Sequence, residues 1–179
     1  MMQGFEGADL VFFVGYHARA GKEGVLSHTF DSPTVVTEVA LNGEPCSEAR
    51  MNATLAGLRG IPVGLMTGDD LACAEAESLY AGVKTAVDRY TARCLSPQVV
   101  QERIREAAGG GDLAPYAPDP PYTFTVEFAT ASSAASVLFF PGLERGDDRR
   151  VSWTHEDYET AFKMFIGVML LSRSDPDYG

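Results

Sequence analysis

The chain contains the stretch Leu10-Val11-Phe12-Phe13-Val14-Gly15-Tyr16-His17, in which apolar residues run almost directly up to a histidine. A continuous apolar run with aromatic and β-branched members is typical of a buried strand, which we expect over residues 9–15. His17 would then follow the carboxyl end of that strand. In open α/β sheets ligands bind at the carboxyl ends of strands, so the stretch favours an α/β fold with a ligand site beside His17.

Strand and helix patterns alternate in the residues that follow. We expect strands near 34–41, 61–66 and 83–87, and helices from Ser47 to just before Gly60, over 71–81 and from Ser96 to about 108. Ser47 and Ser96-Pro97 are favourable helix starts, because serine caps the first amides and proline suits the first helical position. The alternation predicts a layered α/β unit over residues 1–108.

A Gly/Pro-rich stretch follows this unit. Residues 109–121 contain Gly109-Gly110-Gly111 and four prolines, a composition that predicts a linker. Beyond it, strand patterns at 123–128 and 149–153 and helix patterns at 130–140 and 154–172 predict a small α+β lobe over residues 122–179. Thr154-x-x-Asp157 resembles a capping box and is expected to begin the last helix.

The composition excludes several classes of partner. Fourteen basic against twenty-five acidic residues give a net charge of −11, which disfavours nucleic acid and anionic membrane surfaces. The apolar stretch 161–171 is too short to span a bilayer, and the amino terminus lacks the features of an export signal, so we expect a cytoplasmic protein. The three cysteines are widely spaced without a C-x-x-C pair, which favours reduced thiols over a zinc ribbon.

Two of the three histidines, His17 and His28, flank one short loop, and Glu48 and Asn52 follow at the start of the next expected helix. Two histidines and a glutamate are a common ligand set for a catalytic zinc ion. Asn52 lies one helical turn after Glu48, so the two side chains share a face. On spacing alone, loop histidines that bond only the backbone are the more frequent explanation of such a pattern. Asp69-Asp70 likewise suits either a metal or the start of a helix.

The segments Gly15-Tyr16-His17-Ala18-Arg19-Ala20 and Gly24-Val25-Leu26-Ser27-His28 resemble motifs of the zinc-dependent D-aminopeptidases of the dipeptide-transport-operon type. The resemblance continues in the same order at Asn42-Gly43, Glu48 with Asn52, Gly68-Asp69-Asp70, Val83-Lys84, Arg89, Cys94-Leu95-Ser96-Pro97 and Val126-Glu127-Phe128. It implies a hydrolase of the metallopeptidase class that removes D-amino acids from the amino end of short peptides or related amides, using two zinc ions.

The resemblance also implies roles for individual residues. His17 and Glu48 correspond to zinc ligands, and His28 to the catalytic histidine, a general base or nucleophile. Asn52, Lys84 and Arg19 are expected to contact the substrate or to support the ligands. The family forms rings of identical subunits, which implies an oligomer.

The chain departs from the family in one respect. The family's other metal ligands come from an Asp-x-Glu-Gly strand and an Asn-Asp-x-His segment, and neither motif occurs in this sequence. About the first third of the family's length is therefore expected to be missing. We expect low activity for the isolated chain and a complementary subunit that supplies the missing ligands, as in a split enzyme. The alternatives are a truncated enzyme and a non-catalytic scaffold or regulatory subunit that binds a partner protein through an exposed sheet edge.

Overall fold

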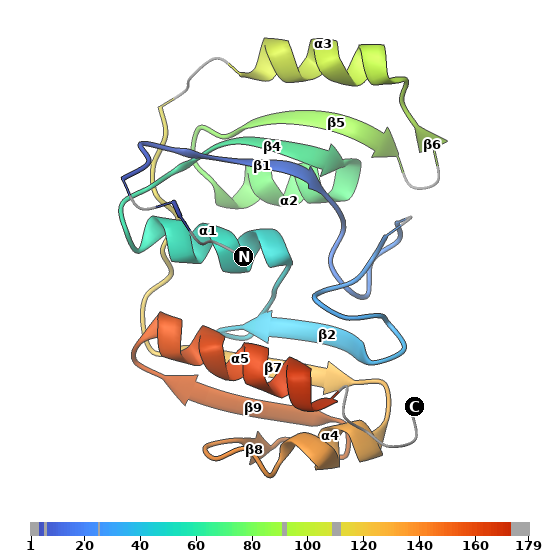
Figure 1. Cartoon of the computed structure of the whole chain (residues 1–179), viewed down its shortest axis with the longest axis vertical. Helices are drawn as coiled ribbons and strands as arrows, with labels where there is room; N and C mark the ends of the chain where they lie inside the picture. Colours follow the sequence, from blue (N-terminus) through green and yellow to red (C-terminus); the bar gives the residue numbers. More distant parts are fainter. Residues whose placement is uncertain (1–3, 6, 25, 91–92, 109–111, 173–179) are drawn as a thin grey trace. The chain divides into compact units, whose positions relative to one another are not determined.

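The computed structural model describes residues 4–5, 7–24, 26–90, 93–108 and 112–172. The chain divides into two compact units. Unit 1 comprises Met1–Ser27 and Ala49–Pro118, and unit 2 comprises His28–Glu48 and Asp119–Gly179. Each unit has a sheet and helices of its own (Figure 1), so the expected mixed α/β fold class is confirmed.

Unit 1 contains a four-stranded sheet in the order β1-β4-β5-β6. Its strands are β1 (Val11–Tyr16), β4 (Val63–Asp69), β5 (Lys84–Tyr90) and β6 (Arg93–Cys94). Strands β1, β4 and β5 run parallel, and the short β6 pairs with β5 in the antiparallel sense. The carboxyl ends of the three parallel strands therefore meet at one edge of the sheet, and His17 follows β1 at that edge.

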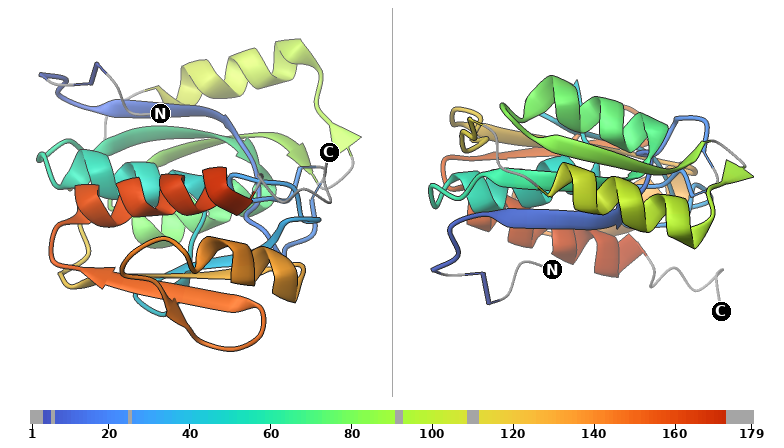
Figure 2. Two further views of the ribbon diagram at one scale, coloured as in Figure 1. Left: turned by 60° about the horizontal axis from the view of Figure 1, so that its bottom comes forward. Right: turned by 90° about the horizontal axis from the view of Figure 1, so that it is seen from above.

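Three helices belong to this part of the chain, namely α1 (Glu48–Gly57), α2 (Asp70–Leu79) and α3 (Pro97–Ala107). Helices α2 and α3 lie on opposite faces of β5 (Figures 1 and 2). The core of unit 1 combines strand residues such as Phe13 and Met66 with alanines of α1 and α2. Alanine side chains are small, so these helices can approach the sheet closely.

Strand β1 is less buried than its apolar sequence indicates. Phe13 is 3% exposed and packs into the core, whereas Leu10, Phe12 and Val14 are 40%, 51% and 67% exposed. Successive side chains of a strand point to opposite faces, so these three share the face opposite Phe13. The expectation of a fully buried strand was wrong, because β1 stands at the edge of the sheet and the described residues cover only one of its faces.

Unit 2 contains a five-stranded antiparallel sheet in the order β3-β2-β7-β9-β8. Its strands are β2 (Val36–Leu41), β3 (Glu44–Pro45), β7 (Tyr122–Phe128), β8 (Glu144–Arg145) and β9 (Arg150–His155). Helices α4 (Ala131–Val137) and α5 (Tyr158–Ser172) accompany it, with α5 along β7 and β9 (Figure 2). The core is aromatic: Phe124 stacks with Trp153 and with Phe165 at centroid distances of 5.5 Å in both pairs.

Residues 28–48 belong to unit 2, although the sequence pattern grouped them with an α/β unit over 1–108. The reason is strand pairing. Strand β2 pairs with β7, which lies more than eighty positions further along the chain, and Val39 opposes Val126 in that pairing. Local periodicity identifies β2 as a strand but carries no information on its distant partner.

The start of α5 also differs from its expected position. Thr154 lies within β9, where its hydroxyl bonds that of Thr123, and the helix begins at Tyr158. Asp157 supplies the cap instead, since its Oδ2 accepts hydrogen bonds from the Thr160 amide and hydroxyl. No helix in the described part of the chain is long and apolar enough to cross a membrane.

The stretch expected to be a linker is partly packed. Residues 109–111 lie outside the described residues, whereas residues 112–118 belong to unit 1. Tyr116 accepts a hydrogen bond from Arg50 Nε at 2.8 Å, and its ring packs against Tyr80 at 5.3 Å. A side chain at Gly57 would overlap the Tyr116 backbone, so the glycine allows this segment to lie directly on α1.

Candidate metal centre

Side chains of two neighbouring strands hold the segment that leads to His17. Thr67 of β4 accepts the Gly15 amide at 2.9 Å, and Arg89 of β5 donates to the Tyr16 carbonyl at 2.8 Å. Asp69, the last residue of β4, accepts the Ala18 amide at 2.7 Å. These bonds fix the backbone on both sides of His17, which a loop after an edge strand would otherwise leave free to move.

The His17 ring bonds its own loop. Its Nδ1 lies 3.0 Å from the Ala18 carbonyl oxygen. Because a carbonyl oxygen only accepts, Nδ1 must be the protonated nitrogen in this contact. In the neutral ring Nε2 then keeps its lone pair, the state required of a metal ligand.

Asn52, on the second turn of α1, contacts the same segment through a hydrogen bond to Tyr16. It is 1% exposed, and its Nδ2 donates to the Tyr16 hydroxyl at 2.9 Å. The Tyr16 ring stacks on Phe13 with a centroid distance of 4.9 Å. The Asn52 Oδ1 atom is buried, and no partner is found for it within the described residues. The Asn52 amide nitrogen is therefore hydrogen-bonded, while its oxygen can still accept a hydrogen bond from a further donor.

The approach of β1 to β4 is very close beside His17. A Cβ atom added at Gly68 would overlap the Tyr16 carbonyl oxygen. Gly68 opposes Tyr16 in the pairing of the two strands. The glycine is therefore required for the pairing that leads the chain into His17.

His28 and Glu48 face one another in unit 2, with His28 Nε2 3.8 Å from Glu48 Oε1. The separation is that of an ion pair rather than a hydrogen bond. Glu48 Oε1 also accepts the Phe30 amide at 2.9 Å. The glutamate therefore binds the loop that contains His28 as well as facing its ring.

The turn after His28 is tight. Phe30 has a φ of 63°, and the Asp31 amide donates to the Thr29 carbonyl at 2.8 Å, which closes a three-residue turn. Positive φ is costly for a bulky residue and persists only where the surroundings enforce it. Here the Glu48 carboxylate holds the Phe30 amide, and the Phe30 ring packs edge-on against Phe165 at 4.9 Å.

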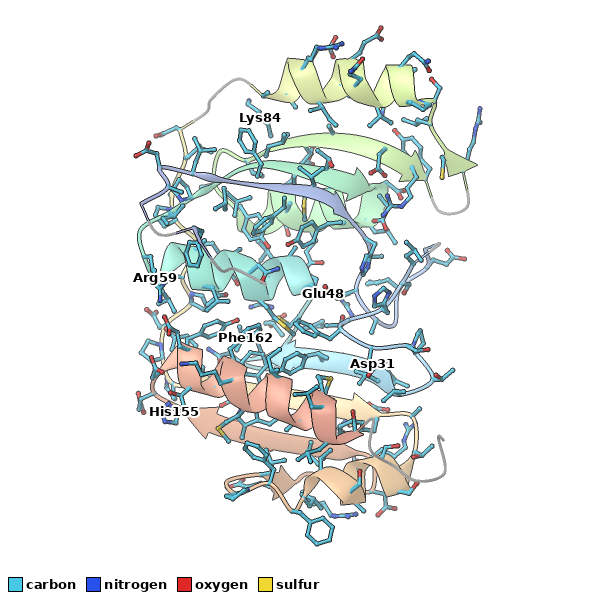
Figure 3. All side chains as sticks on the ribbon, viewed as in Figure 1. Asp31, Glu48, Arg59, Lys84, His155 and Phe162 are labelled. Carbon is cyan, nitrogen blue, oxygen red and sulfur yellow. The ribbon has the colours of Figure 1, made fainter. Side chains whose placement is uncertain are left out.

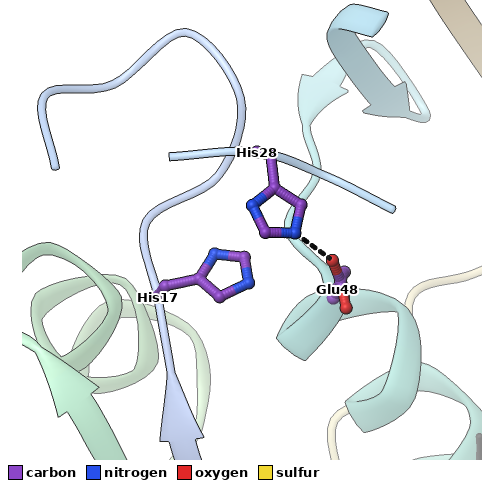
Figure 4. A group of neighbouring side chains, drawn as sticks. All are labelled: His17, His28 and Glu48. Carbon is purple, nitrogen blue, oxygen red and sulfur yellow. Dashed lines mark ion pairs between the residues drawn. The ribbon is translucent and has the colours of Figure 1, made fainter. Parts of the chain in front are cut away.

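His17, His28 and Glu48 form a group of neighbouring side chains (Figure 4). One ligand atom from each lies within 4.8 Å of the others, and all three side chains are half-buried. Imidazole nitrogens and carboxylate oxygens are donors that zinc binds in proteins. The chemistry of these residues therefore fits the ion that the sequence implied.

Lys84 lies at the opposite edge of the unit 1 sheet from His17. It is the first residue of β5, whereas His17 follows the last residue of the parallel strand β1 (Figure 3). Seven strand residues at about 3.3 Å each separate the two edges of the sheet by roughly 20 Å. Arg89, near the other end of β5, occupies the expected edge, where it pairs with Asp88 at 2.7 Å. Arg19 bonds its local backbone at the Ala20 carbonyl, 3.1 Å away.

Two acidic residues and a thiol complete the surroundings. Asp69 Oδ1 accepts the Ala72 amide at 2.7 Å, so Asp69 caps α2, one of the two interpretations of the Asp69-Asp70 pair. Burial, reinforced by the charge of Asp88, raises the pKa of the Cys73 thiol to about 12. Cys73 therefore stays protonated at neutral pH in the metal-free chain. All three cysteines are free thiols.

The sequence interpretation did not predict the roles of three residues in this region. Thr67, Asp69 and Arg89 each bond the backbone around His17. Their signal was present only as family likeness at Gly68-Asp69-Asp70 and Arg89. No spacing rule connects these positions with residues 15–18, which lie about fifty to seventy positions earlier.

The family model described as D-aminopeptidase matches residues 1–166. A D-aminopeptidase of Bacillus subtilis (strain 168) is 35% identical, over 78% of this chain and 55% of its own length. A solved structure, the Zn-dependent D-aminopeptidase DppA from Bacillus subtilis, described as a self-compartmentalizing protease, matches with a TM-score of 0.85 and 29% identity, over 94% of this chain and 65% of that one.

The chain thus spans somewhat more than half of the length of these relatives. The family model nevertheless covers more than nine tenths of the chain. This protein belongs to the D-aminopeptidase family.

Proposed function

We propose that this chain contributes to zinc-dependent removal of D-amino acids from the amino end of short peptides or related amides. The observation that carries the proposal is the convergence of donor atoms from His17, His28 and Glu48. The solved relative is a Zn-dependent D-aminopeptidase, which supports zinc as the ion and D-amino acid derivatives as substrates.

His17 and Glu48 would hold the ion. His17 offers Nε2, because its Nδ1 is engaged with the Ala18 carbonyl. Glu48 offers a carboxylate whose Oε1 is oriented by the Phe30 amide. A bound zinc ion polarises the scissile carbonyl and lowers the pKa of water at this position.

His28 would move the proton. Its Nε2 faces the Glu48 carboxylate at 3.8 Å, and this nearness of the imidazole to a proposed ligand supports the role. A neutral histidine can take the proton from the attacking water and pass it to the departing amine. Asn52, with its unused buried oxygen, and Arg19, on the His17 loop, are the candidates for substrate contact.

We further propose that polypeptide outside these 179 residues completes the site, either in a complementary subunit or in a longer form of the same chain. Two zinc ions require more ligands than His17 and Glu48 provide. The relatives extend well beyond the matched region. The exposed apolar face of β1, at the edge of its sheet, supports a protein partner at that strand.

The test combines metal analysis with hydrolysis of a D-alanyl peptide by the chain, alone and with the complementary polypeptide. We expect bound zinc, and at least 10-fold weaker zinc binding after His17→Ala or Glu48→Gln. His28→Ala should retain zinc and lose about 10²-fold or more in turnover. His155→Ala is the matched control, since this histidine ends β9 and bonds Asp157 rather than the metal group.

Absence of zinc from the chain and from its complex would contradict the proposal. If partner binding persisted in that case, the non-catalytic scaffold role would be favoured, because the β1 face needs no metal to bind a protein. Equal loss of zinc in His155→Ala and His17→Ala would also refute the assigned site.

A further inference from the structure

The Asp69 carboxylate makes two hydrogen bonds with different structural roles in unit 1. It is 1% exposed, and each of its oxygens accepts one backbone amide. Oδ1 accepts Ala72 N–H at 2.7 Å and so caps α2. Oδ2 accepts Ala18 N–H at 2.7 Å, which connects the end of β4 to the residue after His17. The second bond is not needed for the helix.

The Ala18 residue transmits this contact to the His17 ring. Its amide is fixed by Asp69, and its carbonyl accepts the His17 Nδ1–H at 3.0 Å. Ala18 is itself 1% exposed, so water cannot readily replace either bond. Fixing Ala18 therefore fixes both the ring orientation and the nitrogen that holds the hydrogen.

We infer that Asp69 is a positioning residue for His17: it holds the Ala18 backbone so that His17 keeps its hydrogen on Nδ1 and presents Nε2 as a ligand. Metal-binding histidines commonly donate their other ring N–H to a carboxylate or a backbone carbonyl. Here the two arrangements are combined, with the carboxylate acting one residue away through the backbone. The part of this inference that concerns zinc rests on the proposed function, whereas the part that concerns the ring does not.

Asp69→Asn separates the helix-capping role of the carboxylate from its bond to the Ala18 amide. Asparagine is a good N-cap, so its Oδ1 can continue to accept Ala72 N–H. Its Nδ2 then faces Ala18 N–H, and two donors oppose one another. Asp70→Asn is the matched control, because it removes a charge from the adjacent residue in the first turn of α2. Asp69→Ser is a second variant that retains a capping oxygen but is too short to reach Ala18.

The deciding measurement is the tautomer of His17 in the metal-free chain, read from ¹⁵N-labelled histidine by long-range proton–nitrogen NMR, with His17→Ala to assign the signals. We expect the unaltered chain and Asp70→Asn to show hydrogen on Nδ1. Both Asp69 variants should lose this single form and populate hydrogen on Nε2. Zinc affinity, measured by competition with a chelating dye, should fall 10- to 100-fold in the Asp69 variants.

An unchanged tautomer in folded Asp69→Asn and Asp69→Ser would overturn the inference. A changed tautomer in Asp70→Asn would do the same, because the effect would then be one of charge near α2. If the tautomer responds as expected but the unaltered chain binds no zinc, the proposed function fails and the inference about the ring stands.

Discussion

The two sheets of this chain differ in how completely they bury their apolar side chains. In unit 2 the central strand β7 alternates regularly, with Tyr122, Phe124, Val126 and Phe128 all buried. In unit 1 the edge strand β1 buries Phe13 but leaves Phe12 and Val14 substantially exposed, as is Leu10 just before the strand. The sheet of unit 2 buries its own apolar side chains, whereas the sheet of unit 1 has an apolar face that no element among the described residues covers. The difference indicates where a protein partner would gain most by binding.

The largest effect should follow from opening the closed core of unit 2. Phe165 is fully buried, and its ring centroid lies 5.5 Å from that of Phe124 and 6.4 Å from that of Trp153. Phe165→Ala should lower the free energy of unfolding by about 3–5 kcal/mol, through lost burial and the cavity left behind. Denaturant unfolding followed by fluorescence measures this change. Phe139→Ala, at a side chain 91% exposed, is the control and should stay within about 0.5 kcal/mol.

A sharper comparison uses two adjacent residues of β1. Phe13→Ala should cost about 3 kcal/mol, because Phe13 packs with Val63 and Met66 in the core of unit 1. Phe12→Ala should cost about 1 kcal/mol or less, because half of its side chain is already exposed. The same denaturant titration compares the two variants. Equal costs would mean that the outward face of β1 is covered in solution.

The cap of α5 tests how the closed sheet depends on its helix. The Thr160 hydroxyl and amide bonds hold the pKa of Asp157 below its usual value of 3.8. A carboxyl with a lowered folded pKa stabilises the fold above its unfolded pKa, and the effect is lost as pH falls through the folded value. Asp157→Ala should therefore be less stable than the unaltered chain at pH 7, and the difference should disappear in acid below pH 3.8. A difference that persists unchanged at low pH would exclude the charged cap as its cause.

The smallest change in stability is expected on the open face itself. Val14→Lys should leave the free energy of unfolding within about 0.5 kcal/mol, because this side chain is 67% exposed. It should nevertheless reduce self-association or partner binding, since a charge on an edge strand opposes strand addition. Sedimentation velocity over a range of concentrations measures the association. Leu170→Lys, at an exposed position of α5, is the matched control, and an equal effect there would refute a special role for β1.

Much of the local structure was predictable from sequence. The strands β4, β5, β7 and β9 and the helices α1 to α4 lie close to their expected positions, because hydrophobic periodicity and capping residues are local signals. Ser96 with Pro97 begins α3 as expected. The two-residue strands β3, β6 and β8 are too short to give a periodic signal.

Strand pairing and side-chain burial were harder to predict from the sequence. The assignment of residues 28–48 to unit 2 depends on β2 meeting β7, a contact between distant segments. The exposure of Phe12 and Val14 depends on β1 being an edge strand, and an apolar run does not reveal strand order.

The candidate site divides in the same way. His17, His28 and Glu48 were expected from family likeness, and their ligand atoms lie near one another. The bonds of Thr67, Asp69 and Arg89 to the His17 segment arise from the parallel register of β1, β4 and β5, which no single stretch of sequence encodes. The same register places Lys84 at the opposite edge of the sheet from His17. Family likeness gave no information on this position.

Gly68 has a consequence for how this protein can diverge. Any side chain at this position would push the Tyr16 carbonyl away from β4, and the imidazole one residue later would move with it. Relatives that retain an unaltered metal centre should therefore tolerate wide variation on the outer face of β1 yet admit no larger residue at position 68. A homologue with alanine there would be expected either to have shifted its first strand or to have abandoned the chemistry.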